Sequence, residues 1–252
     1  MAQTSQSQYN KRVIGLVFLG LVCETGFARS ILAQPKSIVA APSGFTSSHP
    51  LPDAAEFRRN PGNNTVQRLK APNLASGLLG NERFRSLIDA KRWEDASLFF
   101  LSTISEQLRL KDPSGELRLD SFAEDGLGFK HLRFGQIYRN LPAWGCELQV
   151  HWRSDGSLYL IDGHYIPTPE HINIRPLISS ELALEKARDA LSLSALKSAA
   201  EPPVELGLHR QQGRVSPLLA YRVILPSGLA HSWQIIIDAH SGRLLEKTQG
   251  RR

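Results

Sequence analysis

The chain has 252 residues, of which 41% are hydrophobic, and its formal net charge at pH 7 is +6. This length is sufficient for one large or two small domains with hydrophobic cores of their own. The positive excess is small and scattered, and basic residues do not interleave with aromatic residues along any stretch, which argues against a nucleic-acid partner.

The segment 1–33 has the pattern of a secretory signal peptide. Two basic residues precede an apolar run over residues 13–22, and small residues follow up to Ala28 or Ala33, the two candidate cleavage positions. The apolar run is shorter than the roughly 20 residues that a membrane-spanning helix needs. An uncleaved membrane anchor is the alternative. We expect export to the periplasm or the medium, with no stable membrane span after cleavage.

The two cysteines have different expected roles. Cys23 lies inside the leader, and Val22 stands before it where lipid-modified leaders carry a small residue, so a lipid anchor is disfavoured. Removal of the leader leaves only Cys146, and no intramolecular disulfide is then possible. Cys146 lies on the apolar face of a predicted strand, which favours a buried thiol over a reactive one.

Ordered structure is expected to begin at residue 76. Residues 34–75 are rich in Pro, Ser, Asn and Ala without periodicity, which predicts a disordered linker. Apolar side chains at helical spacing then predict a helix over residues 92–108, which the segment 111–115 ends because Pro113 cannot continue it. A short strand over residues 116–122 follows.

The clearest pattern is an antiparallel meander over residues 131–162. In its central strand apolar side chains alternate with polar ones: Cys146, Leu148, Val150 and Trp152 against Glu147, Gln149, His151 and Arg153. Such alternation indicates one buried and one wet face. A tight turn is predicted at residues 154–156 and a wider one at residues 140–143. The helix over residues 92–108 is expected to cover the apolar face.

The second half repeats this plan without a residue-level repeat. A helix is predicted from Ser179 or Ser180, with a buried face of Ala183, Leu184, Ala187, Ala190 and Leu191. Strands are predicted over residues 204–209, 218–225 and 233–238, and an edge run over residues 243–246.

Both halves resemble the propeptide modules of thermolysin-type metalloprotease precursors. The motifs of the first half resemble the fungalysin/thermolysin propeptide (FTP) motif: Leu110-Lys111-Asp112-Pro113, His131-Leu132-Arg133-Phe134, Trp144-Gly145, Glu147-Leu148 and Val150-His151. Those of the second half resemble a PepSY module: Leu219-Ala220-Tyr221-Arg222-Val223, Trp233-Gln234 and Ile237-Asp238-Ala239. The resemblance implies an FTP-like module over residues 76–170, a PepSY-like module over residues 177–247, and a free tail over residues 248–252.

The fold class expected from this resemblance is α+β, with two modules that each pack a helix on an antiparallel β-sheet (PepSY/cystatin-like). In the family these modules precede a zinc protease domain, which they help to fold and hold inactive. A zinc protease needs the H-E-x-x-H arrangement. None of the 8 histidines stands in that pattern, so we expect no catalytic residues, no metal and no cofactor.

Two residue pairs have the spacing of a functional site but also a structural interpretation. His151 and His164 face each other across the meander if they bind a metal, but solvent-facing sheet residues are the favoured interpretation. Ser194 and Lys197 match the S-x-x-K spacing of some acyl enzymes without the partner motifs, so the frayed end of a helix is favoured.

The sequence is compatible with three functions. The first is an exported, stand-alone propeptide-like protein that binds a thermolysin-type metalloprotease and inhibits it or assists its folding. The second is the propeptide part of a truncated zymogen, and the third a peptide-binding or sensing module of the cell envelope. The predicted docking residues are Trp144, Glu147, Gln149, His151, Arg153, Arg243 and Leu244. The oligomeric state stays open.

Overall fold

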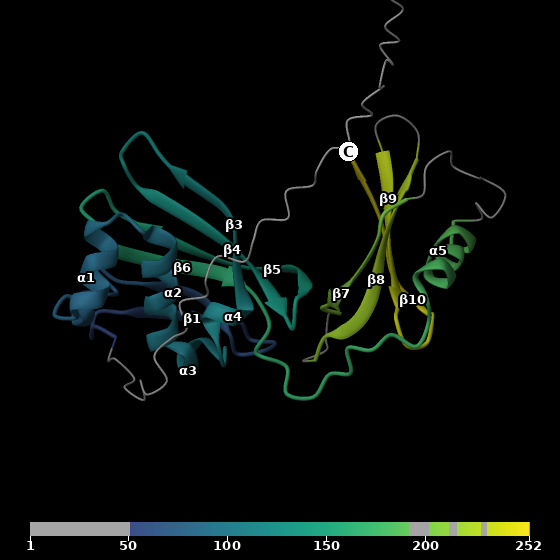
Figure 1. Cartoon of the computed structure of the whole chain (residues 1–252), viewed down its shortest axis with the longest axis horizontal. Helices are drawn as coiled ribbons and strands as arrows, with labels where there is room; N and C mark the ends of the chain where they lie inside the picture. The colour runs from purple at the N-terminus through teal and green to yellow at the C-terminus, as the bar shows by residue number, and fades with distance from the viewer. Residues whose placement is uncertain (1–50, 192–201, 212–215, 228–230, 252) are drawn as a thin grey trace, which may run out of the picture. The chain divides into compact units, whose positions relative to one another are not determined.

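The computed structural model describes residues 51–191, 202–211, 216–227 and 231–251 (Figure 1). The predicted leader and the residues of the S-x-x-K segment lie outside these ranges. Within them, no helix is long and apolar enough to cross a membrane.

The fold class is α+β, as predicted, and its strands join in the order β1-β2-β6-β5-β7-β8-β9-β10, with β3 paired to β4 and β4 to β5. All pairings are antiparallel except that of β5 with β7. The strands are β1 (Glu56–Arg59), β2 (Val66–Lys70), β3 (Leu117–Glu124), β4 (Lys130–Tyr138), β5 (Leu141–Trp152), β6 (Leu158–His164), β7 (Val204–His209), β8 (Leu218–Pro226), β9 (His231–Asp238) and β10 (Leu244–Arg251).

The linker prediction for residues 34–75 is wrong in its described part. β1 and β2 form a hairpin there, and β2 pairs with β6, with Leu69 opposite Ile161. Val66 and Leu69 are 1% and 0% exposed. Their spacing of three residues matches no strand alternation, so pairing with a distant strand, and not a local pattern, orders this segment.

Several short helices, and not one long helix, cover the apolar face of the meander (Figure 1). The predicted helix over residues 92–108 is interrupted at Ile104, whose backbone leaves helical geometry, although Ile104 itself is fully buried. Helix α1 (Glu82–Asp89) was not predicted; it begins after Asn81, whose side chain accepts a hydrogen bond from the Phe84 amide. The helices are η1 (Ser76–Leu78), α1 (Glu82–Asp89), α2 (Trp93–Thr103), α3 (Ser105–Leu108) and α4 (Pro113–Glu116).

Trp152 is the centre of this core. It is 0% exposed, and its ring centroid lies 5.4 Å from that of Trp93 and 6.3 Å from that of Phe84. Its Nε1 donates to Ser97 Oγ of α2 at 3.0 Å, so the buried indole N–H is paired. The prediction that Trp152 belongs to the buried face of its strand is confirmed.

One turn of the meander has the predicted form, and the other does not. Ser154, Asp155 and Gly156 form the expected tight turn, with φ of 81° at Gly156. The wider turn predicted at residues 140–143 is wrong, because Arg139 and Asn140 (φ of 48° and 67°) close a two-residue turn and β5 begins at Leu141. Positive φ at both central residues is the type I′ geometry that suits the twist of a hairpin.

The second helix-and-sheet segment agrees closely with its predictions. α5 (Ser180–Asp189) begins after Ser179, whose side chain accepts from the Leu182 amide, and it buries Ala183, Leu184 and Ala187. Ala190 and Leu191, also predicted on the buried face, follow the end of α5 and are only partly buried. The free tail predicted over residues 248–252 is wrong through residue 251, because β10 continues the edge run and pairs with β9. Residues 248–251 pair with the first four residues of β9, His231 to Gln234, and the local composition of the tail does not reveal this partner.

β5 is shared between the two segments. Residues 147–152 pair with β6, whereas Ala143 and Trp144 pair with β7, and Gly145 (φ of 67°) lies between the two pairings. The Trp144 ring lies directly on Gly207 of β7, where an added Cβ would stand 2.6 Å from the ring.

We predict that Gly207→Ala destabilises the chain by about 1–3 kcal/mol, because the new methyl group displaces a rigid ring and meets the Pro142 carbonyl oxygen. The free energy of unfolding in urea measures this. Gly250→Ala is the control, since nothing lies within 4 Å of its added Cβ. Equal stability of both variants would contradict the contact.

Candidate functional site

The face of β4, β5 and β6 turned away from the helices is polar, and we call it the outer face. Its residues lie opposite one another in register: His151 faces His131, and Gln149 lies between Arg133 and Asp162. This confirms the prediction that the polar side chains of β5 lie on the face opposite its buried apolar side chains. Its side chains are half-buried, however, because neighbouring strands carry long polar side chains beside them. The outer face consists of His131, Arg133, Glu147, Gln149, His151 and Asp162.

Charged groups on the outer face pair with each other. Arg133 Nε lies 3.6 Å from Glu147 Oε2, and the Gln149 amide donates to Glu147 Oε1 at 3.2 Å. The side chains of Arg133 and Glu147 are 52% and 27% exposed. Such exposed pairs contribute little to stability and are available for exchange with charges of a partner.

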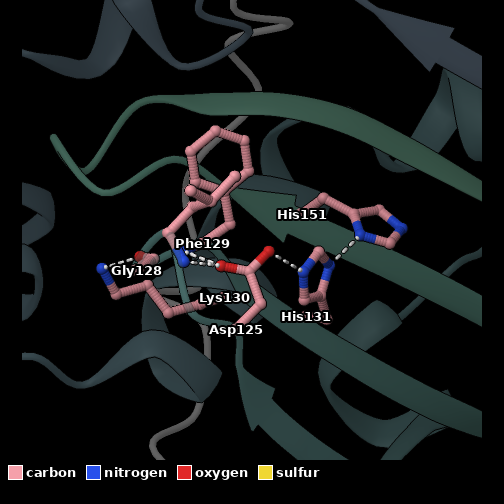
Figure 2. Close-up of polar contacts among 7 residues, drawn as sticks. Asp125, Gly128, Phe129, Lys130, His131 and His151 are labelled. Atoms are coloured by element: carbon pink, nitrogen blue, oxygen red, sulfur yellow. Dashed lines mark hydrogen bonds and ion pairs between the residues drawn. The ribbon is translucent and has the colours of Figure 1, made fainter.

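Two histidines form the shortest of the side-chain contacts described on the outer face. His131 Nδ1 and His151 Nδ1 lie 2.7 Å apart in a hydrogen bond between β4 and β5. On their other sides, His131 Nε2 lies 3.3 Å from Asp125 Oδ2 and His151 Nε2 lies 3.5 Å from Asp162 Oδ2. The four side chains form a row from the β3–β4 turn to β6, of which Figure 2 shows Asp125 and both histidines.

Asp125 holds the β3–β4 turn and His131 at the same time. Its Oδ1 accepts hydrogen bonds from the amides of Leu127 and Phe129, both at 2.9 Å (Figure 2). The pKa of the Asp125 carboxyl is lowered, chiefly because the Phe129 amide donates to the carboxylate. The carboxylate is therefore a fixed negative charge beside His131.

The structure brings together only three of the seven predicted docking residues. Glu147, Gln149 and His151 share the outer face, but Arg153 donates to the Pro72 carbonyl and lies over the Tyr159 ring. Trp144 is half-buried between Gly207 and the guanidinium of Arg222, 5.0 Å from its ring centroid. Arg243 and Leu244 are exposed at the start of β10, which β7, β8 and β9 separate from β5 in the sheet order.

The histidine partner of His151 was not predicted. His164 lies opposite Glu147, so His151 and His164 do not face each other. Near the turn Ile137 is paired with Pro142, and continuing that register would place His131 opposite Leu148. An irregularity between Gly135 and Ile137 shifts the register and brings His131 opposite His151. In the described ranges, no group of three or more His, Cys, Asp or Glu side chains is arranged to hold a metal.

Comparisons with known proteins point to the same segment. Residues 115–165 match the family described as the Fungalysin/Thermolysin Propeptide Motif, which contains β3 to β6 and thus the outer face. Bacillolysin of Bacillus subtilis (strain 168) is 25% identical over 146 residues, 54% of this chain and 27% of that protein. Bacillolysin of Bacillus subtilis subsp. amylosacchariticus matches to the same extent. The chain spans about a quarter of the length of these curated relatives.

Two solved structures are similar at low identity. The C-terminal domain of Bacillus megaterium YpeB is 14% identical, covers 79% of this chain and 83% of its own, and has a TM-score of 0.37. A putative lipoprotein from Clostridium difficile 630 is 10% identical, covers 56% of this chain and 87% of its own, and has a TM-score of 0.24.

The Cys146 thiol should be unreactive in the folded chain. Cys146 is 4% exposed, and burial raises its pKa to about 11. Because only the thiolate reacts, we predict alkylation by iodoacetamide at pH 8 on the order of a hundredfold slower in the native chain than in urea. Peptide mapping separates Cys146 from Cys23. Rapid stoichiometric labelling of native Cys146 would contradict its burial.

His209 should make the fold sensitive to acid. Burial lowers its pKa below the ordinary 6.5, and the Glu246 carboxylate opposes that shift only in part. Below pH 6.5 the unfolded chain therefore binds a proton that the folded chain resists, so stability falls as pH falls towards the lowered pKa. We predict that His209→Gln has a smaller loss of unfolding free energy between pH 7 and pH 5 than the unchanged chain. An identical loss would contradict this.

Proposed function

We propose that this chain is an exported propeptide-like binding module for a thermolysin-type metalloprotease, which it inhibits or helps to fold, and that it is not itself an enzyme. The observation that carries the proposal is the match of residues 115–165 to a propeptide motif. The similarity to bacillolysin supports the same class of protease. A PepSY-like module over residues 177–247 is part of the proposal, as is binding without cofactor, metal or nucleic acid.

The outer face is the docking surface in this proposal. The opposite face of β5 is occupied, since Leu148, Val150 and Trp152 are 0% exposed beneath the helices. The matched segment therefore has one broad face left for a partner. Its ion pairs are partly exposed, which suits recognition by charge complementarity more than by a deep apolar pocket.

Inhibition and assisted folding follow from the same binding step. A module that binds the native protease stabilises it by mass action, and a module that covers the substrate cleft also blocks it. The protease is either a separate chain or the continuation of one precursor. An H-E-x-x-H segment encoded downstream in the same gene would show that the protease is the continuation of one precursor.

The direct test uses the purified chain and mature bacillolysin from Bacillus subtilis. We expect residual protease activity to fall, or the yield of active protease on refolding to rise, at micromolar chain. If neither changes at micromolar concentration, the proposal fails.

Exchanging the charges of one outer-face pair tests the docking surface. Arg133→Glu combined with Glu147→Arg keeps an ion pair in place but reverses its polarity, so the fold should persist. We predict an inhibition constant about tenfold higher, since a reversed pair presents repulsive charges to the partner. Arg153 is avoided because it holds the Pro72 carbonyl.

The matched control exchanges Glu82 and Arg85 on the exposed side of α1, through Glu82→Arg with Arg85→Glu. It changes the same two residue types on the element that covers the other face of the sheet. We expect unchanged inhibition from this variant. Equal inhibition by both exchanged variants would place the interface elsewhere.

A further inference from the structure

The His131–His151 contact is unusual because both rings use the same nitrogen. A hydrogen bond between two Nδ1 atoms needs one N–H donor and one lone pair as acceptor. The contact at 2.7 Å therefore exists only while at least one of the two Nδ1 atoms carries no proton. When both rings are cationic, two N–H groups and two positive charges face each other, and the contact is lost.

The surroundings decide which ring moves. The His151 side chain is 12% exposed, and that of His131 is 35% exposed. A second positive charge is thus poorly solvated at His151, whereas His131 has room to turn outward. Movement of His131 also removes the nitrogen that lies beside Asp125 of the β3–β4 turn.

Charged neighbours surround the pair on every strand that packs against it. Asp125 and Asp162 favour positive charge on the rings, whereas Arg133 and Arg68, on either side of the row, oppose it. Other titratable neighbours are Glu124 at the end of β3, Lys70 opposite Leu160, Glu147 beside Arg133, and Tyr159, whose ring centroid lies 6.2 Å from that of His151. The Arg153 guanidinium lies over the same Tyr159 ring.

We propose that the histidine pair is an acid-sensitive clasp of the outer face, which opens when both rings are protonated and then weakens binding of the protease. The consequence for the protease rests on the proposed function, whereas the opening itself belongs to this chain alone. Histidine suits this role because it is the side chain that ordinarily changes charge between pH 5 and 8. Neutral pH keeps the docking surface assembled, and acid disassembles it.

The first experiment concerns the chain alone, with EDTA present so that no transition metal takes the place of the proton. Urea unfolding is measured from pH 7.5 to 5.0 for the unchanged chain, His131→Asn and His164→Asn. Asparagine at position 131 pairs with His151 Nδ1 without a charge of its own. We expect the acid-induced loss of stability to be smaller for His131→Asn by a slope of about one proton.

His164→Asn is the matched control, because His164 lies at the exposed end of β6 on the same side of the sheet. It should keep the full loss of stability. His209 is present in all three proteins, so its own effect cancels in the comparison. A slope that is the same for all three proteins overturns the proposal.

The second experiment measures the dissociation constant of each protein for mature bacillolysin from Bacillus subtilis at pH 7.5 and 5.0. We expect about a tenfold weakening in acid for the unchanged chain and for His164→Asn, and much less for His131→Asn. Effects of pH on the protease itself are common to all three. Equal weakening in all three proteins overturns the link to binding, whereas no binding at either pH is a failure of the proposed function, and the unfolding slopes then still decide whether the clasp exists.

Discussion

The structure depends on the length of β5 and on the single backbone position that allows it to serve two partners. Ala143 and Trp144 pair with β7 and the last six residues of β5 with β6, and Gly145 provides the left-handed conformation between these two pairings. A residue with a side chain adopts that conformation only with strain. Both sheet segments therefore share one strand, and Trp144 is committed to the contact with Gly207.

The polar side of the same strand depends on the same stretch, because β5 residues 143–146, which include Gly145, lie within the register shift between β4 and β5. The shift near Gly135 decides which β4 side chains meet those of β5, and it brings together two histidines that a regular hairpin would keep apart. A bulge of this kind is a specific feature of a strand pair and re-aims side chains. The chemistry of the outer face is therefore a consequence of backbone register as much as of composition.

Local patterns predict some of this fold and leave the rest open for identifiable reasons. The alternation in β5, the bounds of β7 and the serine start of α5 are readable because each depends on neighbours within one turn or strand. β1 and β2 are not, since β2 pairs with the distant β6, and the end of β10 is not, since its own composition does not show that its pairing with β9 continues. The pairing of His131 with His151 required the bulge, and the use of Arg153 and Trp144 inside the fold required contacts with Pro72 and Gly207.

The pairing of β2 with β6 has a further consequence for the order of folding. The hairpins of the meander close through short turns and form early, whereas β2, whose local partner is β1 alone, joins the meander only when Arg68 can pair with Asp162 of β6. In a chain made or exported from its N-terminus, Val66 and Leu69 therefore remain in water until β6 has emerged. The β1–β2 hairpin, which precedes the meander in the chain, is thus among the last parts to join the native sheet.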